Sequence, residues 1–95
     1  MTQDDLTLVV LMEEASEVAQ AVSKILRFGF AEVYPKRGFD NAEFLARELD
    51  DLLAMAEILR ERGLLRASDP EAIRAKKAKV IHWEAYSELM GRLDP

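Results

Sequence analysis

The side chains in this sequence that could do chemistry lie in two short acidic runs. The first is Glu13-Glu14-Ala15-Ser16-Glu17, and the second is Glu48-Leu49-Asp50-Asp51. Each run falls within a segment whose apolar residues recur every three or four positions, as in an amphipathic helix. Several carboxylates therefore lie on or beside faces that a helix normally buries. Carboxylates that converge in this way are suited to binding a divalent cation.

The second run carries the clearer anomaly. Glu48 is four residues after Phe44 and four before Leu52, so it lies within the apolar face of its helix. Asp51 is three residues further on and lies at the edge of the same face, beside Glu48. Asp50 points elsewhere and is expected to face solvent. This helix is therefore predicted to direct two neighbouring carboxylates inward.

The first run shows a similar arrangement. Glu14 is four residues after Val10 and four before Val18. Glu17 is three residues after Glu14, on the same flank of the helix. Glu13 belongs to the outer part of that flank. One pair of carboxylates on the first helix and one pair on the second are thus predicted to point inward.

Buried carboxylates need either basic partners or a metal ion, because an unpaired buried charge costs several kcal/mol. Lys and Arg do not alternate with these acids at ion-pair spacing on the same faces. Oxygen ligands of this kind favour Mg²⁺ or Mn²⁺, whereas a chain with no Cys and one His is a poor candidate for zinc. The plainer alternative is that all four are ordinary charges on helix surfaces.

The elements that must position these residues are predicted to be three long helices in a single domain spanning residues 1–95. They cover residues 2 or 5 to 28, 40 to 62, and 68 to 90, with a loop over 30–39. Gly29 and Gly63 end the first two helices, and Asp40 with Glu43 forms a capping-box pattern. Leu64 and Leu65 are expected to pack onto the core. The predicted fold is an all-α antiparallel helical bundle.

The last helix has apolar residues on more than one face. Val80 and Ile81 do not share the stripe that contains Trp83 and Tyr86. A second buried surface is therefore expected, and a homodimer that completes a four-helix core would supply it. The alternative is that Ile81 is simply exposed, as single apolar residues often are.

Bulk properties narrow the functional class. The net charge of −5 disfavours nucleic-acid binding, which normally needs a basic surface. The longest apolar run, residues 6–12, is broken by Thr7 and is too short to cross a bilayer. Without cysteine there is no disulfide framework, which fits a cytoplasmic protein.

The two motifs together resemble those of a known family. Glu14-x-x-Glu17 followed by Glu48-x-x-Asp51 is similar to the MazG-like all-α nucleoside triphosphate pyrophosphohydrolases. The flanking segments are similar too: Lys24-Ile25-Leu26-Arg27-Phe28-Gly29, Asn41, and the later Tyr86-Ser87. The resemblance covers nearly the whole chain and is greatest to small stand-alone members from phages and bacteria.

The resemblance implies an activity and a set of roles. The family cleaves a nucleoside or deoxynucleoside triphosphate, with Mg²⁺ (Mn²⁺ is also suitable), to the monophosphate and pyrophosphate, a reaction that clears unwanted nucleotides from the pool. It implies Glu14, Glu17, Glu48 and Asp51 as metal ligands, and a homodimer or homotetramer. A nearby carboxylate would accept a proton from water, and Glu13 and Glu17 are both candidates for this catalytic base.

The substrate's phosphates require basic side chains, and the last helix is rich in them. Lys79 lies on its apolar stripe and is the first candidate for a phosphate contact, with Lys76 second. For the basic residues of this helix other than Lys79, the plainer alternative is a solvated face that pairs with the acidic helices. Weaker candidates are Lys24, Arg27 and Asn41. His82 is expected to be a core or interface residue, and the loop over 30–39 is either a lid or a plain connector.

Two other functions remain open from the sequence. One is a phosphoribosyl-ATP pyrophosphohydrolase, which belongs to the same broad superfamily and has similar length. The other is a helical module without enzymatic activity that dimerises or docks onto a partner.

Overall fold

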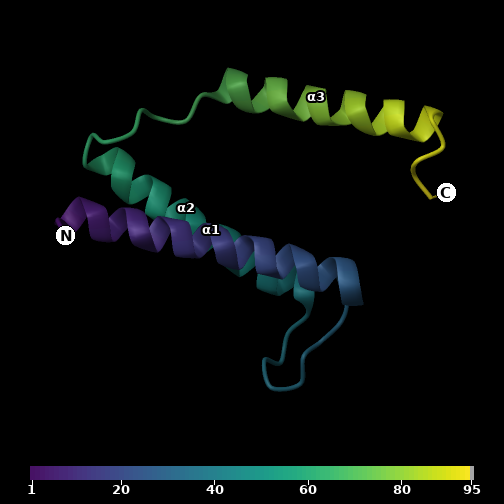
Figure 1. The fold of residues 1–95 in the computed structure, drawn as a ribbon, viewed down its shortest axis with the longest axis horizontal. Coiled ribbons are helices and arrows are strands. Elements are labelled where there is room, and N and C mark those ends of the chain that lie inside the picture. Colours follow the sequence, from purple (N-terminus) through teal and green to yellow (C-terminus); the bar gives the residue numbers. More distant parts are fainter. Residues whose placement is uncertain (95) are drawn as a thin grey trace.

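The computed structural model describes residues 1–94 and contains three α-helices (Figure 1). They are α1 (Gln3–Phe28), α2 (Asn41–Glu61) and α3 (Pro70–Leu89). Within the described residues there is no strand, and a single isolated bridge joins Val33 and Asp40. The predicted all-α class with three long helices is confirmed, and the helix bounds agree to within about two residues.

Side-chain caps fix where the helices begin. Thr2 and Asp5 form a reciprocal capping box at α1, in which each side chain accepts a hydrogen bond from the other's backbone N–H. Asp40 caps α2 by accepting from the Glu43 N–H at 2.8 Å. The reciprocal half of the predicted box is not formed, because the Glu43 carboxylate pairs with Arg47 instead.

The helices α1 and α2 form an antiparallel hairpin joined by residues 29–40 (Figure 1). Its core is small: among the described residues the buried apolar side chains are Ala21, Ile25 and Leu59. Ala21 is fully buried.

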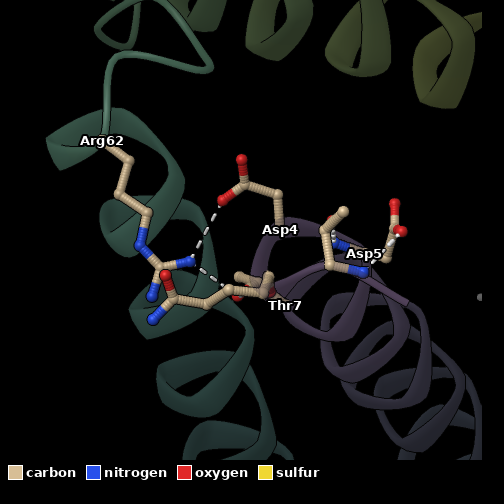
Figure 2. Close-up of polar contacts among 6 residues, drawn as sticks. Asp4, Asp5, Thr7 and Arg62 are labelled. Carbon is tan, nitrogen blue, oxygen red and sulfur yellow. Dashed lines mark hydrogen bonds and ion pairs between the residues drawn. The ribbon is translucent and has the colours of Figure 1, made fainter.

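A polar clamp closes the open end of this hairpin (Figure 2). Arg62, just beyond α2, donates from Nη1 to the buried Thr7 hydroxyl at 2.8 Å and to the Asp4 carboxylate at 3.5 Å. The Thr7 hydroxyl in turn donates to the carbonyl of Gln3 at 3.0 Å. The beginning of α1 is thereby held to the end of α2.

The third helix lies apart from this hairpin (Figure 1). No described residue of α3 packs against α1 or α2, and every α3 residue except Ser87 is exposed. The radius of gyration is 16.9 Å, whereas a compact domain of this length has about 12 Å. The single chain thus leaves α3 without a packing partner.

One prediction about the core is wrong. Leu64 and Leu65 are each 48% exposed, because the chain turns away from the hairpin after Arg62. Trp83 and Tyr86 of α3 are also exposed in the single chain. Among the described residues, no helix is long and apolar enough to cross a membrane.

The polar clamp gives a direct test of how the hairpin is held together. Arg62→Ala removes the donor that reaches Thr7, while the Thr7 hydroxyl keeps its bond to Gln3. We expect a loss of about 1 kcal/mol in the free energy of unfolding, measured by urea denaturation. Arg74→Ala, which removes an exposed ion pair with Glu71, should change it by less than about 0.5 kcal/mol. Equal effects of the two substitutions would contradict a special role for the clamp.

Candidate metal centre

The hairpin brings three of the predicted carboxylates together. Glu14 and Glu17 of α1 and Glu48 of α2 each offer an oxygen, and these oxygens all lie within 4.8 Å of one another. Glu14 and Glu17 are neighbours because they are one helical turn apart. Antiparallel pairing of α2 then places Glu48 against them. We call these three residues the carboxylate cluster.

Two oxygens of the cluster have no partner. Oε2 of Glu14 and Oε2 of Glu48 are shielded from solvent, and neither forms a hydrogen bond to any described residue. The ion pairs formed within residues 1–94 all lie elsewhere in the chain: Arg47–Glu43, Arg62–Asp4 and Arg74–Glu71. Shielded carboxylate oxygens without donors raise the free energy of the native state. Oxygens in this state fit a hard cation as their missing partner.

The electrostatics of the cluster reflect this crowding. Burial raises the pKa of Glu48, and the close approach of Glu17 raises it further, followed by the charges of Asp51 and Glu14. Burial also raises the pKa of Glu14, with added contributions from Glu17, Asp51 and Glu13. Both carboxyl groups are therefore harder to ionise than an ordinary glutamate unless a positive charge joins them.

The remaining acids of the two runs stand at different distances from the cluster. Asp51 is exposed and contributes negative charge at both Glu14 and Glu48, but it does not belong to the close group. Glu13 is exposed and close enough to influence Glu14. Asp50 is exposed, as expected. Three oxygens thus converge, and a fourth carboxylate lies beside them.

The basic residues predicted to meet the phosphates are divided between two places. Lys76 and Lys79 lie on α3, which does not contact the hairpin, so the single chain does not bring them to the cluster. Lys24 and Asn41 line a cavity of about 350 Å³ at the loop end of the hairpin. Arg27 stacks on Phe28, another residue of the cavity wall. The other lining residues are Glu32, Val33, Tyr34, Pro35 and Arg37.

This cavity lies on the same side of the hairpin as the carboxylate cluster. Lys24 is seven residues after Glu17, and Asn41 is seven residues before Glu48, so both stand about two helical turns away. That separation is about 10 Å along the helix axes. A cavity with basic residues and a carboxylate cluster are therefore aligned along one edge of the hairpin.

Asn41 organises the loop that forms the cavity. Its side chain is buried, with Nδ2 donating to the Gly29 carbonyl and Oδ1 accepting from Arg37, both at 2.9 Å. Because both ends of this amide are engaged, Asn41 positions the loop rather than offering a free donor or acceptor in the cavity. It was predicted as a substrate contact, and the geometry gives it this supporting position.

Arg37 was considered from the sequence only as part of a loop that could close over the substrate, and it lines the cavity. Its guanidinium lies over the rings of Phe39 at 5.0 Å and Phe44 at 4.5 Å, and it also donates to the Phe39 carbonyl. The signal in the sequence was a basic residue between aromatics, which becomes informative only when the loop is folded.

No known protein family, curated protein or solved structure matches the chain.

The raised pKa values predict how the metal-free protein responds to pH. Glu14 and Glu48 bind protons more readily in the folded state than in the unfolded state, where their pKa is near 4.5. Stability should therefore rise as the pH falls through their folded-state pKa values toward about 4.5, because the neutral carboxyls no longer repel. Thermal unfolding in EDTA from about pH 8 to about pH 5 measures this.

Two matched variants isolate the cluster from general charge effects. Glu48→Gln should raise Tm in EDTA near neutral pH and flatten the pH dependence, since it removes the unpartnered charge. Glu57→Gln removes an exposed carboxylate nine residues along α2, on its opposite side, and should leave the profile close to wild type. If Glu48→Gln lowers Tm at neutral pH, the cluster is not a site of repulsion.

Proposed function

We propose that this chain is a Mg²⁺-dependent nucleoside triphosphate pyrophosphohydrolase of the MazG-like type. It would convert a nucleoside or deoxynucleoside triphosphate and water to the monophosphate and pyrophosphate. The observation that carries the proposal is the convergence of Glu14, Glu17 and Glu48, two of which have shielded oxygens without any partner. A surface cluster of acids would instead spread apart into solvent.

The cluster fits a hard cation by the chemistry of its donors. Glu14, Glu17 and Glu48 would hold the cation through their carboxylate oxygens, and water or phosphate oxygens would complete its coordination. The cation would neutralise phosphate charge and lower the pKa of the attacking water. Asp51 stands beside the three ligands and is the fourth candidate. Mn²⁺ prefers the same oxygen donors, so it is expected to substitute.

A carboxylate near the cluster would serve as the general base. Glu13 is exposed and close to Glu14, while Glu17 is the exposed member of the cluster. Either can take the proton as the water oxygen bonds to phosphorus. The anhydride bond between the α- and β-phosphates then breaks, and pyrophosphate leaves with the bonding electron pair.

The aligned cavity would hold the nucleoside end of the substrate. Its volume of about 350 Å³ falls within the range of small-molecule sites, and Phe28 and Tyr34 contribute aromatic surface. Lys24, on the wall that continues toward the cluster, is placed to approach the phosphates. Lys76, Lys79 and Arg27 are further candidates for phosphate contacts, with the lysines of α3 dependent on assembly.

The proposal includes an assembled, cytoplasmic enzyme that acts on the nucleotide pool. The exposed apolar side chains of α3 and the small hairpin core support a homodimer or homotetramer. A freely exposed set of this kind is unusual for a monomer of this size. Nucleic acid is not an expected partner, given the net charge of −5. A membrane is not expected either, because the longest apolar run is too short to cross one.

The activity is tested by pyrophosphate release from a panel of ribo- and deoxynucleoside triphosphates in Mg²⁺. Glu48→Gln should reduce kcat/KM on the order of a hundredfold or more, because it removes a charged ligand that supports the transition state. Asp50→Asn is the matched control, since Asp50 is exposed and neighbours the cluster only in sequence. It should retain near wild-type activity.

Metal binding is measured separately by thermal unfolding. Mg²⁺ should raise the Tm of wild type and of Asp50→Asn but not of Glu48→Gln, because a ligand that binds only the folded state stabilises it. Cleavage of phosphoribosyl-ATP alone would transfer the proposal to that substrate. If Mg²⁺ causes no shift in Tm, with or without nucleotide, the proposed metal site is wrong. The alternative of a helical dimerisation module would then remain.

A further inference from the structure

Two basic side chains at the loop end of the hairpin form no ion pair. Lys24 of α1 and Arg37 of the loop are both half-buried, and both line the cavity. The ion pairs within residues 1–94 include neither of them. Arg47 provides a contrast, because Glu43 meets its charge at 3.2 Å from one helical turn away. The cavity wall therefore carries two positive charges that lack a paired carboxylate.

The ring of Phe44 holds these two cations close together. Lys24 Nζ lies 4.9 Å from the ring centroid, and the guanidinium carbon of Arg37 lies 4.5 Å from it. The two charges are thus at most about 9.4 Å apart, the sum of those distances. Attraction to the ring offsets only part of their mutual repulsion. The hydrogen bonds of Arg37 go to uncharged oxygens of Phe39 and Asn41, so they leave its charge in place.

The described part of the chain supplies no close anion for this pair. Glu32 lines the same cavity, but its side chain is exposed and pairs with neither cation. Glu17, the member of the carboxylate cluster nearest to Lys24 in sequence, is about 10 Å from it along the helix axis. A ligand is therefore the remaining source of the missing negative charge.

The rest of the cavity wall is suited to a flat ring. Phe28 and Tyr34 contribute aromatic surface, and Val33 and Pro35 add aliphatic surface. The volume of about 350 Å³ is near the lower end of the range for small-molecule sites. A space of this size suits one ring system that carries a single charged group.

The charge of the wall distinguishes between classes of anion. A phosphate monoester carries about −1.5 to −2 at pH 7, whereas a carboxylate carries a single negative charge. One phosphate monoester therefore balances both cations, and one carboxylate does not. A phosphate that accepts hydrogen bonds of about 2.8 Å from both side chains would separate the two charges by roughly 8 Å, within the limit that Phe44 sets.

We propose that the cavity binds a phosphate monoester carried on a flat ring, and that it does so without a metal ion. The phosphate lies between Lys24 and Arg37, and the ring lies against Phe28 and Tyr34. The identity of the ring rests on the hydrolysis proposed above, which makes the ligand a nucleoside monophosphate, the product of that reaction. A product retained in this way competes with fresh triphosphate.

Binding is tested by calorimetric titration of the metal-free protein in EDTA near neutral pH. The common nucleoside monophosphates are compared with the corresponding nucleosides and with inorganic phosphate. At least one monophosphate should bind about tenfold or more tightly than its nucleoside and than phosphate, because it alone offers both the ring and the dianion. Equal affinity of monophosphate and nucleoside, or no binding of any monophosphate at about 5 mM, would overturn the proposal.

The position of the phosphate is tested by removing one cation. Lys24→Met keeps an unbranched apolar stem without the charge, and affinity for the monophosphate should fall about tenfold. Lys36→Met makes the same change beside Arg37 in sequence but outside the cavity wall, so affinity should fall less than about twofold. Equal losses would indicate a general charge effect and would contradict the placement.

Removal of the carboxylate on the wall should act in the opposite direction. Glu32→Gln should raise affinity for the monophosphate by about twofold to threefold, because it removes a negative charge near the phosphate. A variant that only disturbed the loop would weaken binding instead. Glu57→Gln, the matched control on α2 outside the cavity, should leave affinity unchanged. No gain in Glu32→Gln, or an equal gain in both variants, would contradict the proposed site.

These titrations separate the cavity from the proposed activity. They contain neither Mg²⁺ nor triphosphate, so they measure binding of the monophosphate alone. If the chain releases pyrophosphate in Mg²⁺ but binds no monophosphate in EDTA, only the inference about the cavity is wrong. If it binds monophosphates in EDTA but releases no pyrophosphate, the cavity site holds and the proposed activity is wrong.

Discussion

The carboxylates of Glu14, Glu17 and Glu48 come together in the middle of a two-helix hairpin that offers them no cation. Their mutual repulsion tends to part α1 from α2, and the small apolar core resists this only weakly. The hairpin is instead closed at its two ends. Arg62 joins Thr7 at one end, and Asn41 joins Gly29 and Arg37 at the other. These contacts oppose the repulsion between the carboxylates in the middle of the hairpin.

Charge is divided unequally between the parts of the chain. The hairpin is strongly acidic, and the first half of α3 is basic, although the chain as a whole has only a modest net charge of −5. An acidic centre of this kind is suited to a cation, and a basic segment is suited to an anion. Within one chain, α3 does not contact the acidic hairpin.

Much of the local structure could be read from the sequence because the signals are local. Asp40, Gly29 and Gly63 fixed helix ends through caps and turns that involve only nearby residues. The three- and four-residue spacing among apolar residues placed Glu14 and Glu17 on one flank of α1, and Glu48 on the apolar face of α2. The structure brings these three carboxylates together. Asp51 lies just outside the close group, since spacing defines a face but not the reach of a side chain.

The placement of α3 could not be read in the same way. Periodicity shows that Trp83 and Tyr86 need cover, but it does not say which surface supplies it. Leu64 and Leu65 were misplaced for a related reason, because the direction of the chain after Gly63 depends on a backbone turn rather than on composition. The position of Arg37 between Phe39 and Phe44 depends on the folded loop, which no residue spacing encodes.

Because Asn41 anchors both ends of the loop, the shape of the cavity and the spacing of the carboxylates can change independently in evolution. One buried amide fixes both the residue that leaves α1 and the residue that approaches α2, and the Val33–Asp40 bridge closes the base of the loop. The stretch between those anchors can gain or lose residues at little cost in closure entropy. Its length and side chains shape the cavity but not the hairpin register. Selectivity for a ligand can therefore drift in the loop while the spacing of the carboxylates stays constant.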